Sequence, residues 1–345
     1  MGIDRRAWLR GAAALALLPH ALRAQPSGTR LLASWAAPEG SQLGVLELAD
    51  GALHVAAALA LPGRAHGLLR ATDGSVLAMA RRPGDWMLRW RPGAPTAQWR
   101  WIEADRAFTG HAWLDPDGRT LYTPETDLDS GLGLIGVRDA ASLEKRAEWP
   151  TGGPDPHALL ADATGRLYVA NGGVQTRPES GRRKLAPERM DASLVRLAPD
   201  GTLEGQWRLA DARLSIRHLA WGAGARLGIA LQAEHDHPEQ RAAAPVLATF
   251  DGRTLQTAEP DALSGYGGDV AAWGTGFAVS CPRAGGVALW DGEGRRAGFV
   301  ALPEACALAG REALWMGGRG QALEATGAAH ALPALQLDNH WLLLG

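Results

Sequence analysis

The chain has 345 residues, of which 46% are hydrophobic and 21% are charged, and this composition excludes a disordered protein and a coiled coil. The formal net charge of -2 gives no reason to expect binding to nucleic acid. The 44 glycines and 21 prolines, with short apolar runs between them, favour an all-β repeat protein over a helical one.

The N-terminal segment has the pattern of a twin-arginine export signal. Arg5 and Arg6 precede an aromatic residue, a leucine and a basic residue, and a short apolar run follows over residues 11–19. The pattern predicts a signal over residues 1–24 and a periplasmic mature protein. The apolar run is too short for a stable membrane-spanning helix, so we expect no stable span once the signal is removed. An amphipathic helix of the mature fold is the alternative.

Seven predicted strands open just after a short polar loop, and five of these openings carry a histidine. The histidines are His66, His111, His157, His218 and His340, while Asp269 and Cys306 take the corresponding places in the other two units. The first and last histidines are 274 residues apart, and six intervals separate the seven strand openings. Each interval is therefore about 46 residues, the length of one four-stranded propeller blade. We therefore expect these side chains to point into one central channel.

Each complete unit contains four short predicted strands, separated in several places by Asp-Gly or Pro-Gly turn signals. In the first unit the predicted strands cover residues 66–71, 75–81, 86–90 and 98–102. The second, third and fourth units repeat the pattern from His111, His157 and His218. The fifth unit opens at Asp269, and the sixth runs from near Cys306 to about Leu335.

The two ends of the chain complete the last unit. Only one strand, 341–344, can follow His340, whereas the mature N-terminus supplies three, over 30–35, 43–48 and 53–61. The predicted fold is therefore all-β, a seven-bladed β-propeller over residues 25–345, closed by one C-terminal strand plus three N-terminal strands. Closure removes an exposed sheet edge. Six or eight blades are the alternatives.

In a propeller, the loops that enter the innermost strands share one face with the loops that join second to third strands. That face therefore gathers the histidines with polar residues at the ends of second strands. The predicted metal ligands are His66, His111, His157, His218, His340, Glu125 and Asp269. Imidazole is the commonest side-chain ligand of transition metals, and carboxylates can complete such a shell. The alternative role of each histidine is a hydrogen bond that ties one blade to the next.

Other residues of this face are predicted to contact a ligand. Arg81, Arg82 and Arg217 would neutralise an anionic group, and Asn171 would offer an amide. The insertion over residues 172–192 carries two excess positive charges and is either a lid over the face or a solvated loop.

Two smaller patterns also leave alternatives open. Cys281 and Cys306 are either a disulfide or two free thiols. His235 and His237 form the one H-x-H motif of the chain, and its charged, turn-like surroundings favour solvated side chains over a metal site.

Segments along nearly the whole mature chain resemble domain-of-unknown-function family 1513, whose members carry twin-arginine leaders. The segments are 61–67, 80–84, 110–122, 133–137, 156–157, 169–173, 214–219 and 338–340. The resemblance implies a propeller-like fold. Members often lie beside imelysin-type and di-haem-peroxidase-like proteins in iron-regulated gene clusters, which implies a part in periplasmic iron acquisition and iron-uptake proteins as partners. Thr176-Arg177-Pro178 departs from the Thr-His-Pro expected in the family.

These observations predict a non-enzymatic periplasmic propeller. Its histidine-lined face would bind a transition metal (iron or copper), haem or a partner protein in the service of iron acquisition. The alternative is a metal-dependent, lactonase-like hydrolase with an oxygen-rich site built from Glu125, Asn171 and Asp269. A pure interaction platform without a small ligand is a third possibility.

Overall fold

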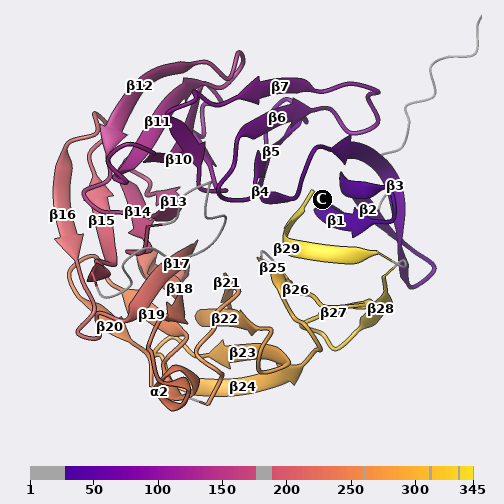
Figure 1. The fold of residues 1–345 in the computed structure, drawn as a ribbon. Coiled ribbons are helices and arrows are strands. Elements are labelled where there is room, and N and C mark those ends of the chain that lie inside the picture. The colour runs from indigo at the N-terminus through magenta and orange to yellow at the C-terminus, as the bar shows by residue number, and fades with distance from the viewer. Residues whose placement is uncertain (1–27, 176–188, 260–261, 311–312, 333–334, 345) are drawn as a thin grey trace, which may run out of the picture.

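A ring of antiparallel β-sheets surrounds one central axis (Figure 1). The structure is a computed structural model that describes residues 28–175, 189–259, 262–310, 313–332 and 335–344. The predicted export signal and most of the insertion over 172–192, including Thr176-Arg177-Pro178, lie outside these residues. Within the described ranges, no helix is both long and apolar enough to span a membrane.

Four of the sheets contain four strands each, in the order of the sequence. The first consists of β4 (Ala65–Arg70), β5 (Val76–Ala80), β6 (Trp86–Trp90) and β7 (Gln98–Trp101). Another consists of β13 (Pro156–Ala161), β14 (Leu167–Asn171), β15 (Ser193–Leu197) and β16 (Leu203–Trp207). The next consists of β17 (Leu214–Trp221), β18 (Leu227–Ala233), β19 (Leu247–Phe250) and β20 (Leu255–Thr257). The last consists of β21 (Asp269–Trp273), β22 (Gly276–Cys281), β23 (Gly286–Trp290) and β24 (Arg296–Ala301).

One sheet has a divided inner strand. It contains β8 (Arg106–Phe108), β9 (Trp113–Leu114), β10 (Thr120–Asp127), β11 (Gly133–Asp139) and β12 (Lys145–Pro150). Both β8 and β9 pair with β10, so the inner edge of the sheet is broken between residues 108 and 113. His111 lies in this break.

The two ends of the chain meet in an eight-stranded sheet. Its strand order is β25-β26-β27-β28-β3-β2-β1-β29. These strands are β25 (Ala307–Gly310), β26 (Leu314–Gly317), β27 (Gln321–Glu324), β28 (Ala329–Ala331), β1 (Arg30–Ala37), β2 (Gly40–Ala49), β3 (Ala52–Leu61) and β29 (Gln336–Leu343). A single parallel pair, Ala331 with Ala52, joins its two four-stranded halves. We interpret the halves as separate blades, an interpretation that gives seven blades.

The all-β propeller prediction is confirmed, and the C-terminal strand β29 lies beside β1 as the closure requires. The second strands are buried on both faces because a neighbouring sheet packs on each side. This explains the continuous apolar run of β5 and the complete burial of β22. Outer strands such as β24 alternate between half-buried and exposed residues. Helical segments are short: a 3₁₀ turn at Ala223–Ala225 and α2 (Pro238–Ala243).

Candidate functional site

Five histidines line the centre of the ring at one end of the inner strands. His66 lies on β4, His157 on β13, His218 on β17 and His340 on β29, and His111 lies between β8 and β9. Figure 1 shows that β4, β13, β17 and β29 surround the axis of the ring. We call these five residues the histidine cluster.

The histidines on strands sit where the regular pairing of the inner strand is interrupted. The register of β4 against β5 shifts between Ala65 and Leu68, and that of β13 against β14 shifts between Pro156 and Leu159. The register of β17 against β18 shifts between Ile216 and Leu219, and that of β29 against β1 shifts between Leu337 and Trp341. By contrast, β21, which opens with Asp269, pairs without a shift. Because a bulge redirects a side chain, each interruption turns an imidazole towards the axis.

The imidazole rings are in mutual contact. In every pair of these rings except His157 with His340, the centroids lie between 4.5 Å (His66 to His340) and 5.9 Å (His66 to His218) apart. The Nε2 atoms of His157 and His218 are 3.1 Å apart. In the group of His66, His111, His157 and His218, each residue offers one ring nitrogen, and these nitrogens all lie within 4.8 Å of one another. The structure thus brings together side chains that are up to 152 residues apart in the sequence.

Two glycines allow this close approach. A Cβ atom at Gly110 would lie 2.7 Å from Cδ2 of His66, and the φ of Gly110 is +109°. A Cβ atom at Gly67 would lie 2.5 Å from the carbonyl oxygen of Gly110, which accepts a hydrogen bond from the Gly67 amide. A side chain at either position would therefore push His66 away from His111.

Burial favours the neutral form of four imidazoles, those of His66, His111, His157 and His218. It lowers the pKa of His66, His111, His157 and His218 well below the ordinary value, and the positive charge of neighbouring histidines and arginines lowers each pKa further. Neutral imidazole is the form that binds a metal ion. One nitrogen of each ring in the cluster is buried without a hydrogen-bond partner among the described residues: Nδ1 of His66, His157 and His218, and Nε2 of His111 and His340.

Asp269 joins the cluster as a partner of His340. Its Oδ2 atom lies 3.0 Å from Nδ1 of His340 and accepts a hydrogen bond from the Leu308 amide, while Oδ1 accepts one from the Val270 amide. Both carboxylate oxygens are thus engaged. The structure places Asp269 as the group that orients His340 rather than within the four-histidine group.

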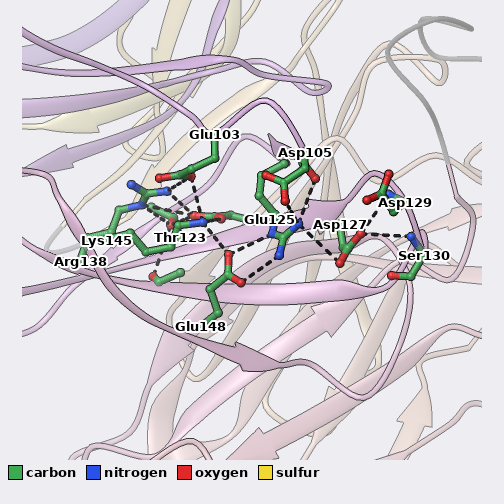
Figure 2. A network of polar contacts seen from close by, with 12 residues as sticks. Glu103, Asp105, Thr123, Glu125, Asp127, Asp129, Ser130, Arg138, Lys145 and Glu148 are labelled. Atoms are coloured by element: carbon green, nitrogen blue, oxygen red, sulfur yellow. Dashed lines mark hydrogen bonds and ion pairs between the residues drawn. The ribbon is translucent and has the colours of Figure 1, made fainter.

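Glu125 does not join the histidines. Figure 2 shows it in another group of charged residues, the β8–β12 ion network, which consists of Glu103, Glu125, Arg138, Lys145 and Glu148. Oε1 of Glu125 accepts hydrogen bonds from Thr123 (2.7 Å) and Arg138 (2.7 Å), and Oε2 accepts one from Lys145 (3.0 Å). The prediction of Glu125 as a metal ligand is therefore wrong.

The physical reason is the alternation of side chains along β10. Glu125 lies on the same face as Leu121, which packs with Met79 and Met87 of the neighbouring β4–β7 sheet. The side chain therefore points between two sheets instead of into the channel. Burial at this interface requires cationic partners, which β11 and β12 supply.

Of the predicted ligand-binding residues, Arg81 and Arg82 line a cavity, whereas Arg217 and Asn171 are buried in contacts within the fold. Arg82 and Arg217 share one carboxylate: the first donates to Oδ1 of Asp155 (2.5 Å) and the second to Oδ2 (2.7 Å). Arg81 and Arg82 both line the cavities described below. Asn171 is fully buried at the end of β14, where Nδ2 donates to the Thr151 carbonyl and to Ser193, and Oδ1 has no hydrogen-bond partner among the described residues.

A polar cavity of about 660 Å³ opens beside the cluster. Its lining includes Arg81, Arg82, Arg241, Arg283 and Tyr266. A second, small cavity of about 20 Å³ shares Arg81, Arg82 and Tyr266 with it and is also lined by His66, His157 and His218. The sequence did not indicate Asp155, Arg241 or Tyr266, because each lies in a connection whose path depends on the fold.

The remaining motifs lie outside the cluster. Cys281 is buried, Cys306 is partly buried, and both are free thiols, which agrees with one of the two alternatives. His235 lies 3.0 Å from Asp211, and His237 is exposed just before α2, so the H-x-H pair does not converge on one point.

The family of the chain follows from the match of its sequence to a family profile. The family described as "Protein of unknown function (DUF1513)" matches residues 59–344. The chain belongs to this family. No curated protein matches the sequence of this DUF1513 member.

Solved structures resemble the DUF1513 chain in fold. A streptogramin B lyase structure has a TM-score of 0.58 at 10% identity, covering 90% of this chain and 88% of the other. Hydrazine synthase of Kuenenia stuttgartiensis has a TM-score of 0.59 at 11% identity, covering 83% and 91%. The β-propeller domain of Myceliophteria thermophila Cps50 (Swd1) has a TM-score of 0.50 at 12% identity, covering 76% and 83%. At these identities the likeness concerns the propeller fold alone.

Proposed function

We propose that this protein binds a transition-metal ion through His66, His111, His157 and His218 at one end of the propeller channel. One observation carries the proposal: four imidazoles from four different sheets, three of them buried and that of His111 partly buried, present ring nitrogens within 4.8 Å of one another. At His157 and His218 the converging atoms are Nε2, which lie 3.1 Å apart, and Nδ1 on the other side of each ring has no hydrogen-bond partner among the described residues.

The chemistry of the donors selects the class of ion. Neutral imidazole suits zinc, copper, iron and nickel, whereas magnesium and calcium prefer oxygen ligands. Two nitrogens bound to one ion at about 2.1 Å in tetrahedral geometry are about 3.4 Å apart. The 3.1 Å between the Nε2 atoms of His157 and His218 is close to that separation. His340, held by Asp269, packs against His66 and His218 and fixes the orientation of the rings.

The biological setting is part of the same proposal. The export signal predicted from Arg5 and Arg6 would place the protein in the periplasm. The resemblance to proteins encoded in iron-regulated clusters supports a role in iron acquisition, with iron or copper as the bound ion and iron-uptake proteins as partners.

The hydrolase alternative lacks its site. It requires an oxygen-rich group of Glu125, Asn171 and Asp269. In the structure Glu125 is neutralised by Arg138 and Lys145, and both carboxylate oxygens of Asp269 accept hydrogen bonds from backbone amides. The residues present therefore favour nitrogen ligation.

A metal titration tests the proposal. Metal-free protein is titrated with Co²⁺, whose visible absorption reports the number and type of ligands. We expect saturable binding by the wild type and none by the double variant His111→Ala/His218→Ala. Binding that is identical in both proteins would refute the site.

A further inference from the structure

We propose that the 660 Å³ cavity beside the histidine cluster binds a small molecule carrying several oxyanion groups, one of which reaches the metal ion held by the histidines. The inference rests on the proposed function, because the ion is part of the binding site. It extends that function by naming the chemical class of the second ligand, a polycarboxylate or polyphosphate.

The charge of the cavity is the first argument. Four arginines and one glutamate line it: Arg81, Arg82, Arg241, Arg283 and Glu234. Four positive charges against one negative charge leave a formal excess of three. Guanidinium groups recognise carboxylate and phosphate through paired hydrogen bonds, so a cavity with four of them favours a ligand with more than one oxyanion.

The position of the cavity is the second argument. Arg81, Arg82, Gln232 and Tyr266 line both the large cavity and the small one that reaches His66, His157 and His218. The two cavities are therefore adjacent, with the histidines at the inner end. A ligand of the large cavity would reach the ion by way of the small cavity.

The electrostatic balance of the site is the third argument. The cluster supplies neutral ligands, and Asp155 is shared between Arg82 and Arg217. A metal dication at the cluster would thus add positive charge to an already positive region. An anionic ligand would balance both the ion and the arginines. The volume of the cavity also falls within the range of about 300–1,000 Å³ typical of small-molecule sites.

The origin of the lining residues explains how the fold builds this cavity. Arg81 and Arg82 follow β5, Arg283 follows β22, and Arg241 belongs to α2 after β18. Each comes from a connection between a second and a third strand, so all lie on the face where the histidines open the inner strands. Tyr266 lies under Arg283, with the guanidinium carbon 4.3 Å from its ring centre.

Calorimetric titration of the mature protein with citrate and with pyrophosphate tests the proposal. Each anion is added to metal-free protein and to protein loaded with Zn²⁺, and the zinc content is measured before and after each titration. We expect the zinc-loaded protein to bind at least one of the two anions more tightly than the metal-free protein does. The preferred anion distinguishes carboxylate from phosphate ligands.

Matched variants locate the site. The double variant Arg241→Gln/Arg283→Gln should weaken anion binding by about tenfold or more and leave the zinc content unchanged. The control Arg91→Gln/Arg295→Gln removes the same charge from turns between third and fourth strands, where both side chains are exposed, and should bind like the wild type. Unchanged affinity in Arg241→Gln/Arg283→Gln would overturn the proposal.

The outcomes separate this inference from the proposed function. Zinc-loaded wild type that binds neither anion overturns the anion site and leaves the metal site intact. A protein that takes up no zinc but binds an anion in an arginine-dependent manner supports the cavity as an anion site and overturns the metal assignment.

Discussion

The histidine cluster and the β8–β12 ion network both bury ionisable side chains, but they differ in how many of the buried polar atoms have hydrogen-bond partners. In the network, both oxygens of Glu125 have donors, and Arg138 reaches Glu125, Thr123 and a backbone carbonyl. In the cluster, each ring keeps one buried nitrogen without a partner among the described residues. A saturated network holds sheets together, whereas imidazole nitrogens that converge within 4.8 Å can bind one metal ion.

The comparison predicts the largest stability effect in the network. Glu125→Ala leaves Arg138 and Lys145 without their shared carboxylate, and Arg138 is fully buried. We expect the free energy of unfolding to fall by about 3 kcal/mol, because the buried Arg138 guanidinium keeps only the Glu103 carboxylate, 3.5 Å away, as an ionic partner. Urea unfolding measures this change.

An exposed acidic residue provides the control for this prediction. Glu144, whose side chain is 65% exposed, pairs loosely with Arg100 at 3.7 Å. Glu144→Ala should cost less than about 1 kcal/mol. If Glu125→Ala unfolded like the wild type but bound less metal, Glu125 would belong to the metal site after all.

Metal binding should stabilise the wild type through the cluster. At a free metal concentration of about 100 times the dissociation constant, linkage predicts about 2.7 kcal/mol of added stability. The double variant His111→Ala/His218→Ala should gain none, since two of the four ligands are absent. Thermal unfolding with and without Zn²⁺ measures the difference. An equal shift in both proteins would contradict the assignment.

The cluster also predicts a dependence of stability on pH. Burial, followed by the charge of nearby imidazoles and arginines, lowers the pKa of His218 in the folded protein. The unfolded chain takes up this proton near pH 6.5, but the folded chain does so only at lower pH. The unfolded state therefore binds more protons below pH 6.5, and the stability of the metal-free protein falls as the pH falls.

A single variant measures the share of one histidine in this slope. His218→Ala should reduce the loss of stability below pH 6.5 by up to about 1.4 kcal/mol per pH unit, the contribution of one proton. Urea unfolding over this pH range gives the slope. A variant that loses stability as steeply as the wild type would show that His218 is protonated in the folded protein.

The smallest expected effect concerns Asp269. Asp269→Asn removes the charge that holds His340 but keeps an oxygen for the Leu308 amide. We expect metal affinity to fall by about tenfold, the lower end of the effect for partners of metal-bound histidines, because His340 packs against the ligands and is not one of them. Competition with a coloured chelator measures the affinity. Complete loss of binding would instead make Asp269 a ligand.

The sequence predicted what the repeat itself encodes. The spacing of about 46 residues and the strand-opening histidines indicated the propeller and the convergence of imidazoles on one channel. The place of β29 beside β1 followed from counting strands at the two ends. These features could be predicted because the same order of short strands, turns and strand-opening histidines recurs along the chain.

The sequence could not predict contacts between strands. Glu125 lies near the end of a second strand, as do the other polar residues predicted for the histidine-lined face. Only the pairing of β10 with β11, and of β11 with β12, brings Arg138 and Lys145 to it. The register shifts at His66, His157 and His218 could not be predicted from the spacing of the repeat. A bulge interrupts the strand pairing, but no recognisable turn residue marks it in the sequence.

Elemental analysis of the purified protein tests the central claim most directly. The wild type, His111→Ala/His218→Ala and the control His235→Ala/His237→Ala are loaded with Zn²⁺ under the same conditions and desalted. We predict about one ion per chain in the wild type and the control, and a background level in His111→Ala/His218→Ala. Equal metal content in all three proteins, or none in the wild type, would contradict the assignment of the histidine cluster as a metal site.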